Sequence, residues 1–270
     1  MSACVSLSVD RRPCRRQGWT LKRHRALIAC ALCLSMFDHA YAQLGADGVV
    51  LIDQPAAEAG GVTPGDDPGF PVTLSRPGSY RLSGNLRLTN PTTNGIEITA
   101  ASVTVDLNGF VIEGPADVCR LNLRPTWCGQ LGTGIGISAV STSDTTIVNG
   151  TVRAIAGKGL WLGRGARVEG LVITDNREFG VAAADLFISK SRISRNGLRA
   201  QVAAVACQIC IVMDNLLEWN GVFGNWSRAI EASYSVDYGN NVLRGNHGVS
   251  AGPGGVRAVA PNLCDNLLCQ

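Results

Sequence analysis

One sequence pattern occurs four times and determines the architecture: Gly170-Leu-Val-Ile-Thr-Asp-Asn176, Lys190-Ser-Arg-Ile-Ser-Arg-Asn196, Asp214-Asn-Leu-Leu-Glu-Trp-Asn220 and Asn240-Asn-Val-Leu-Arg-Gly-Asn246. Each of them places an aliphatic residue three positions before an asparagine, and the asparagines follow at steps of 20, 24 and 26 residues. Self-similarity at a period of this length is typical of repeat proteins, in which one structural unit stacks on the next.

The segments between these copies are short and alternate between apolar and polar residues. Looser copies occur at Asp106-Leu-Asn-Gly-Phe-Val-Ile112 and Ile147-Val-Asn-Gly-Thr-Val-Arg153, and glycine bounds runs such as Gly180-Val-Ala-Ala183. Alternation indicates strands, and no stretch has the length of a crossover helix between parallel strands. The period therefore predicts an all-β fold, a single parallel β-helix whose coils stack at about 4.8 Å.

Stacked coils bring equivalent residues together, so the alignment of the copies predicts contacts. The aliphatic positions should form one inward column, and the asparagines should form a hydrogen-bonded ladder at one turn. The members of these rows are Ile173, Ile193, Leu217 and Leu243, and Asn176, Asn196, Asn220 and Asn246. The 41-residue step from Asn108 to Asn149 is long enough to predict roughly two coils.

The first 42 residues have the three regions of a secretory signal peptide. Seven basic residues precede an apolar run from Ala26 to Phe37, and Ala40-Tyr-Ala42 precedes Gln43 as a cleavage site. The run has 12 residues, too few to cross a bilayer. We expect cleavage between Ala42 and Gln43, a periplasmic or secreted protein, and no transmembrane anchor after cleavage.

Cleavage changes what the composition means. The 270-residue chain has 24 basic and 21 acidic residues, but seven of the basic and two of the acidic residues precede Gln43, which leaves a net charge near −2. This balance excludes a polyanion-binding argument, and we expect no nucleic-acid partner. His247 is then the one remaining histidine, so no multi-histidine metal site is expected.

The stretch from Gly69 to Gly114, with Gly239-Asn-Asn-Val-Leu-Arg-Gly-Asn246 and Asn262-Leu-Cys-Asp-Asn-Leu-Leu-Cys269, resembles bacterial right-handed parallel β-helix repeat proteins. The resemblance covers nearly all of residues 43–270. It implies the right-handed, pectin-lyase-like fold for residues 71–270, but the group is largely uncharacterised and implies no activity.

The ends and the six remaining cysteines fit a capped solenoid. Residues 43–70 are not repetitive, and Asp53-Gln-Pro-Ala-Ala-Glu-Ala-Gly60 suits a short helix as an N-terminal cap. Outside the leader, disulfides are expected, and we predict the local bridges Cys119–Cys128, within an insertion loop at 115–132, and Cys264–Cys269. Cys207 and Cys210 would lie about 10 Å apart in a straight strand, which favours small buried residues over a bridge across a turn.

The alignment also yields candidate site residues. Thr174, Ser194, Glu218 and Arg244 should form one external row, and Asp175, Arg195, Trp219 and Gly245 the next. Opposite charges then meet as Glu218 beside Arg244 and Asp175 beside Arg195. These are either surface ion pairs or flanks of a sugar-binding face on which Trp219 stacks; Glu218, Asp175 and Arg195 are also weak catalytic candidates. Further candidates for binding carbohydrate lie in the widest coils: Trp226, Tyr234, Tyr238, Arg228, Glu231 and Asp237.

The sequence therefore favours an exported, non-catalytic scaffold or carbohydrate-binding surface with no cofactor. The alternative is a lyase or glycoside hydrolase acting on an acidic polysaccharide; a lyase would need Ca²⁺. The acidic residues do not cluster as either enzyme requires. A self-associating solenoid would need exposed coil ends, and the oligomeric state is open.

Overall fold

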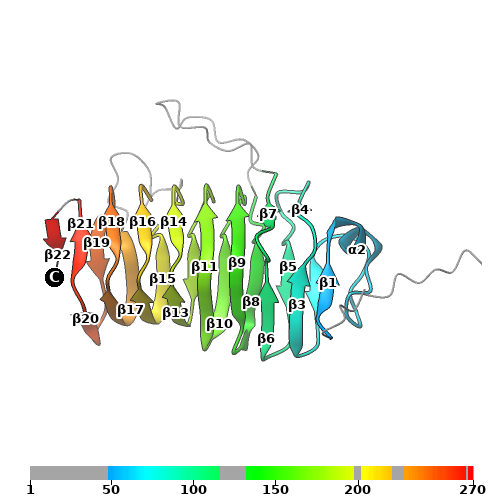
Figure 1. Ribbon diagram of the computed structural model, residues 1–270, viewed down its shortest axis with the longest axis horizontal. Coiled ribbons are helices and arrows are strands. Elements are labelled where there is room, and N and C mark those ends of the chain that lie inside the picture. Colours follow the sequence, from blue (N-terminus) through cyan, green and yellow to red (C-terminus); the bar gives the residue numbers. More distant parts are fainter. Residues whose placement is uncertain (1–47, 116–131, 198–201, 221–227, 266, 270) are drawn as a thin grey trace, which may run out of the picture. The chain divides into compact units, whose positions relative to one another are not determined.

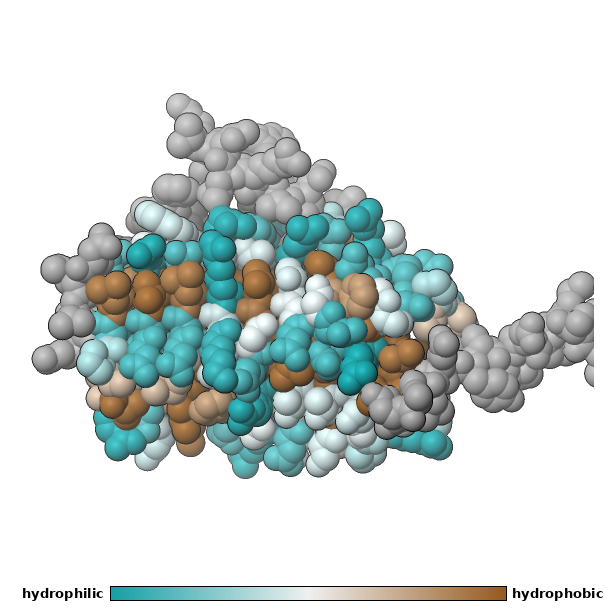
Figure 2. Space-filling view, viewed as in Figure 1, coloured by the Kyte–Doolittle hydropathy of each residue, from teal (hydrophilic) through white to brown (hydrophobic). Residues whose placement is uncertain are grey.

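The computed structural model describes residues 48–115, 132–197, 202–220, 228–265 and 267–269, which are the residues that are not grey in Figure 1 and Figure 2. Its strands form a parallel β-helix of about seven coils, nearly all of it β-structure. Each full coil contributes one strand segment to each of three columns, and hydrogen bonds run from coil to coil within a column. The predicted fold class is confirmed.

The columns contain the following strands. Column one comprises β2 (Val72–Leu74), β5 (Ile96–Ile98), β8 (Ile137–Ser143), β10 (Leu160–Arg164), β12 (Val181–Ala183), the first parts of β15 (Val205–Met213) and β17 (Arg228–Gly239), and β19 (His247–Ser250). Column two comprises β1 (Val50–Ile52), β3 (Gly78–Leu82), β6 (Val103–Asp106), the first parts of β9 (Thr146–Arg153) and β11 (Ala166–Thr174), β13 (Asp185–Ser189), the second parts of β15 and β17, and β20 (Gly255–Ala258). Column three comprises β4 (Leu86–Arg87), β7 (Val111–Glu113), the second parts of β9 and β11, β14 (Arg192–Ser194), β16 (Leu216–Glu218), β18 (Val242–Arg244) and β21 (Asn262–Cys264). Antiparallel β22 (Leu267–Cys269) follows β21.

A short helix and a polar loop close the N-terminal end of the solenoid. Helix α2 (Gln54–Ala59) begins where the Asp53 carboxylate accepts a hydrogen bond of 2.9 Å from the Ala56 amide, and Gly60 ends it with φ 72°. This is the expected capping helix. The cap segment also contains β1, which pairs with β3, so the solenoid includes a strand that lies before the helix.

Asp66 and Thr63 occupy the outer edge of β2, the first strand of column one. The Asp66 carboxylate accepts from the amides of Thr73 (2.6 Å) and Val62 (2.9 Å), while the Thr63 hydroxyl donates to the Thr73 carbonyl (2.6 Å). Unpaired edge groups are templates for unwanted strand pairing, so these side chains protect the edge.

Aliphatic residues stack in register through the interior. The predicted column is present: Ile173, Ile193, Leu217 and Leu243 are adjacent from coil to coil and buried. A second inward stack in column two contains Ile147, Val168, Ile188, Val212 and Tyr238. Fully burying one such aliphatic side chain stabilises a protein by about 1.5–3 kcal/mol, so these stacks supply much of the core's stability.

The predicted asparagine ladder is confirmed at the turn after column three. The amide nitrogen of Asn176 donates to Oδ1 of Asn196 (2.8 Å), Asn196 donates in the same way to Asn220 (3.1 Å), and Asn220 to Asn246 (3.1 Å). Each Oδ1 also accepts from the backbone amide of the preceding asparagine, as at Asn176 (3.1 Å). The ladder thereby satisfies polar groups that the solenoid buries.

A second ladder, at the turn between columns two and three, was not predicted. Asn215 donates to Oδ1 of Asn241 (3.2 Å), and Asn241 donates to Oδ1 of Asn262 (3.0 Å). The residues before the first two, Asp214 and Asn240, have positive φ of 59° and 56°, a conformation that Asn and Asp adopt more readily than most residues.

The prediction of two coils between Asn108 and Asn149 is wrong. Asp106 pairs directly with Val148, and Ile96 pairs directly with Ile137, so a single coil spans this interval. The extra length is the insertion, of which residues 116–131 lie outside the described part of the chain. An insertion between two strands lengthens one coil without adding another, because the flanking strands still pair with their neighbours.

Candidate functional site

The predicted site residues of column three lie on adjacent coils in the expected register. Thr174 pairs with Ser194, Ser194 with Glu218, and Glu218 with Arg244. The next position along the chain is the turn that leads into the first ladder, and Asp175, Arg195 and Trp219 all adopt positive φ there, of 53–59°. The turn surface formed by Asp175, Arg195, Trp219 and Gly245 is called the Trp219 surface below.

Asp175 and Arg195 form a bidentate ion pair between neighbouring coils. Nε of Arg195 lies 2.6 Å from Oδ1 of Asp175, and a terminal nitrogen lies 2.7 Å from Oδ2. The hydrogen bonds that Arg195 donates to Asp175 raise the pKa of Arg195, against a smaller opposing effect of burial. Parallel contacts of this kind fix the orientation of both groups.

Glu218 is held between two arginines. Its carboxylate lies 3.1 Å from Arg192 and 3.8 Å from Arg244, and only 9% of the residue is exposed. Glu113 repeats the arrangement farther along the same row, 3.2 Å from Arg87 and 2.8 Å from Arg153. Each of these carboxylates thereby connects an arginine of the preceding coil with an arginine of the following coil.

The row of Thr174, Ser194 and Glu218 is buried, which corrects the expectation of an external row. Thr174 and Ser194 are 7% and 2% exposed, and their hydroxyl groups lie 3.1 Å apart in a hydrogen bond. Their register is as predicted, but neighbouring groups cover them. Glu218 is thus less accessible than a catalytic acid facing a polymer would be.

Trp219 is the most exposed large apolar residue of the described chain, at 62%. Its indole lies against Gly245 of the next coil, where a Cβ atom would be only 2.3 Å from the ring carbon Cε3. The glycine therefore leaves room for the ring to lie against the backbone of the next coil. The residue remains largely exposed and follows Glu218 at the turn where Arg195 and Asp175 occupy the equivalent positions.

The remaining candidates for binding carbohydrate are not gathered at the Trp219 surface. Arg228 and Glu231 form an ion pair of 3.0 Å in column one, and Asp237 accepts from Nε of Arg257 at 2.8 Å in column two. Tyr234 is exposed between these positions. Trp226 lies outside the described residues.

Tyr238 does not belong to the surface for which it was predicted. It is 2% exposed and pairs in register with Val212 in the interior stack of column two. Strand β17 runs continuously through this region, and alternation over its last residues directs Val236 and Tyr238 inward and Asp237 outward. The width of the coil, which made Tyr238 a candidate, therefore does not expose this residue.

The cysteines divide into described and undescribed positions. Cys119 and Cys128 lie outside the described residues, and so does the side chain of Cys269; Cys264 is disulfide-bonded, and its predicted pairing with Cys269 stays a prediction. Cys207 and Cys210 are buried, as expected, but their Cα atoms are 6.0 Å apart rather than about 10 Å. A shift of register between Cys207 and Ile209 kinks β15 and brings the two cysteines together. Their Cα–Cα distance is one that a disulfide can span.

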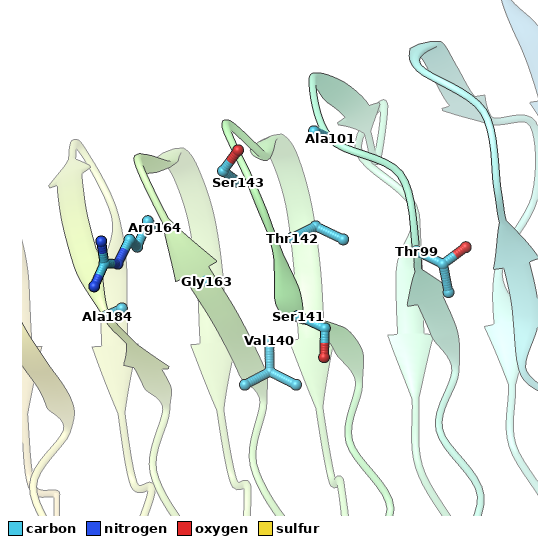
Figure 3. A pocket seen from close by; sticks show the side chains of 9 residues that line it. All are labelled: Thr99, Ala101, Val140, Ser141, Thr142, Ser143, Gly163, Arg164 and Ala184. Carbon is cyan, nitrogen blue, oxygen red and sulfur yellow. The ribbon is translucent and has the colours of Figure 1, made fainter.

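A groove of about 540 Å³ lies at a different corner, where column one turns into column two (Figure 3). It is lined by Thr99, the segment from Val140 to Ser143, Arg164 and small residues. The repeat pattern does not predict this groove, because the groove arises from differences in turn length between coils and not from a repeated residue.

Two further observations concern metals and membranes. No group of three or more histidine, cysteine, aspartate or glutamate side chains in the described residues is placed to hold a metal ion. Within the same residues, no helix has the length and apolar character needed to cross a membrane.

The fold defines the class of this protein as a parallel β-helix. Comparison with known proteins adds no narrower assignment: no family model matches the chain, and no significant match is found among curated proteins or solved structures.

Proposed function

We propose that this chain is an exported, non-catalytic β-helix that binds carbohydrate at the Trp219 surface. The observation that carries the proposal is the Trp219 ring, which lies against Gly245 while the residue as a whole is 62% exposed. A rigid aromatic face of this kind offers a large contact area to the C–H face of a sugar ring at little entropic cost.

The groups beside the ring supply polar contacts in fixed positions. Two nitrogens of Arg195 are bonded to Asp175. A guanidinium has five N–H donors, so others stay available to sugar hydroxyl groups. Because the pair is already formed, binding would not have to order these side chains, and preorganisation of this kind favours affinity.

The carboxylates of this region favour binding over catalysis. A glycoside hydrolase needs one carboxyl group that carries a proton and can donate it. Glu218 lies between Arg192 and Arg244, and Asp175 is bonded twice by Arg195. Both carboxylates are engaged in ion pairs with arginine and Glu218 is only 9% exposed, so neither is presented to a substrate as a catalytic carboxyl group must be.

A glycan array probed with the purified mature chain tests the proposal. Trp219→Ala should abolish the signal, because it removes the stacking face. Trp161→Ala is the matched control: Trp161 is also partly exposed, at 37%, but lies in column one beneath Lys158. Equal binding by the Trp219→Ala variant and the wild type would refute the assignment of the surface.

Export is tested separately by sequencing the N-terminus of the mature protein. The proposal expects Gln43 as the first residue of protein recovered from the periplasm or the medium. A protein that retains Met1 and remains inside the cell would contradict export without affecting the assignment of the Trp219 surface.

A further inference from the structure

The groove at the corner between columns one and two has its own structural cause. The turn from β5 to β6 contains residues 99–102, but single residues, Gly165 and Ala184, connect β10 to β11 and β12 to β13. The corner therefore recedes from one coil to the next, and the groove follows this step across four coils (Figure 3). Four coils span about 14 Å.

A bulge in β8 builds one wall. Leu162 pairs with Ala139 and Arg164 with Ser143, so three residues, Val140, Ser141 and Thr142, lie opposite Gly163 alone. A Cβ atom on Gly163 would lie 1.9 Å from the Thr142 carbonyl oxygen, so the bulge requires glycine there. Bulges next to a groove commonly redirect side chains toward a ligand.

Arg164 is unusual among the arginines of this protein. It is exposed, and the described residues offer its side chain no ion pair or hydrogen bond. Nine other arginines of the described chain do form ion pairs: Arg81, Arg87, Arg153, Arg167, Arg192, Arg195, Arg228, Arg244 and Arg257. Most guanidinium groups of the described chain are therefore paired with a carboxylate, whereas the guanidinium of Arg164 lines the groove without one.

We infer that this groove binds a phosphate monoester carried on a sugar or another polyol, with Arg164 holding the phosphate. The other polar lining consists of hydroxyl groups, from Thr99, Ser141, Thr142 and Ser143. Hydroxyl groups both donate and accept, as the hydroxyl groups of a polyol also do. The groove spans four coils, so the sugar or polyol can lie in it beside the phosphate group.

A single exposed guanidinium favours phosphate over carboxylate. Exposed pairs between arginine and a carboxylate contribute little. A phosphate monoester carries a charge of about −2 above its second pKa, together with three acceptor oxygens that a guanidinium can meet with two donors. Asp144 directly follows the lining residue Ser143 and would repel a phosphate; its carboxylate accepts from the Ser143 hydroxyl at 2.8 Å and does not line the groove.

Calorimetric titration with glucose 6-phosphate tests the inference, with glucose and inorganic phosphate as probes of the separate parts. We expect saturable binding of glucose 6-phosphate, weaker binding of inorganic phosphate and none of glucose. Arg164→Gln should weaken binding about tenfold or more, the loss of one charge-assisted contact. Asp144→Asn should strengthen it, because the substitution removes a repulsive charge and asparagine tolerates the φ of 57° there.

Arg177→Gln is the matched control, because Arg177 also lacks an ion pair in the described part of the chain but follows the Asn176 ladder at another corner. It should leave binding unchanged. Ala184→Trp should block the groove without changing its charge. Binding should also strengthen as the pH rises from about 5 to about 7.5, because the ligand ionises through its second pKa near 6 and no histidine lines the groove.

Binding to phosphatidic acid vesicles, compared with phosphatidylcholine vesicles, distinguishes a membrane-borne phosphate monoester from a soluble one. Binding that depends on Arg164, whether to glucose 6-phosphate or to phosphatidic acid vesicles, supports a phosphate monoester as the ligand group. Equal binding by wild type and Arg164→Gln, or absence of saturable binding in both arms, would overturn the inference. Trp219→Ala should bind glucose 6-phosphate normally, so failure here is distinct from failure of the proposed carbohydrate site.

Discussion

Replacing Asn196 by alanine should destabilise the β-helix strongly, because this side chain connects three coils. Asn196 is fully buried. Its Oδ1 accepts from the backbone amide of Asn176 at 3.1 Å and from the side-chain amide of Asn176 at 2.8 Å. Its own amide donates to the Ile173 carbonyl at 2.9 Å and to Oδ1 of Asn220 at 3.1 Å.

The substitution leaves these partners buried without Asn196. Each buried polar group that loses its partner costs about 1–3 kcal/mol, and some of these groups keep a second hydrogen bond, so we expect a loss of about 3–5 kcal/mol. For a domain of this size, that lowers the melting temperature by roughly 10 °C. Urea unfolding followed by circular dichroism gives the free energy directly.

Asn90→Ala is the control for this experiment. Asn90 is an exposed loop residue whose Oδ1 accepts only from the amide and hydroxyl of Thr92. Its removal should change stability by no more than about 0.5 kcal/mol. A loss below about 1 kcal/mol in Asn196→Ala would refute the view that the ladder satisfies groups the fold cannot leave unpaired.

Three other perturbations test separate parts of the structure. Gly245→Ala should cost at least about 1–2 kcal/mol in urea unfolding, because alanine is strained at φ 60° and its Cβ would displace the Trp219 ring; the glycan signal should fall with it. Asp66→Ala should cost about 2–4 kcal/mol, since two amides at the sheet edge lose a charged acceptor, while exposed Asp67→Ala should be neutral; equal effects would contradict the edge-closing role. The pKa of Glu169 is lowered to about 2, chiefly by the hydrogen bond that Lys190 donates to it. The contribution of Glu169 to the free energy of unfolding is therefore complete above about pH 4.5 and lost as the pH falls through about 2. Acid titration of the wild type and of Glu169→Gln should show their stabilities converging over that pH range.

The repeat predicted the features that depend on stacking alone. Equivalent residues of successive coils lie about 4.8 Å apart whatever covers them, so the aliphatic column, the ladder from Asn176 to Asn246 and the Asp175–Arg195 pair could be derived from spacing. The second ladder had a signal too, in the asparagines at 215, 241 and 262. Asn215 and Asn241 lie near the start of two aligned copies, where no common aliphatic residue marks the position, and Asn262 lies beyond the last copy.

Features that depend on the path of one coil were not predictable in this way. The alignment places Ser194 beside Glu218 but does not say what covers them, so their burial was missed. Tyr238 was chosen as a surface candidate because its coil is among the widest, yet most of the extra residues of that coil precede Ile230, and Tyr238 lies on strand β17 with its side chain in the core. The kink between Cys207 and Cys210 and the groove at Arg164 likewise come from local changes in register or turn length.

The proposed function requires that the Trp219 surface bind carbohydrate without cleaving it. The most direct measurement is prolonged incubation of the mature chain with the best-binding glycan, with and without Ca²⁺, followed by mass spectrometry of the glycan. We predict an unchanged glycan in both cases, together with binding that Trp219→Ala abolishes. Shortened or unsaturated products that disappear in Glu218→Gln or Arg195→Gln would contradict it and establish an enzyme.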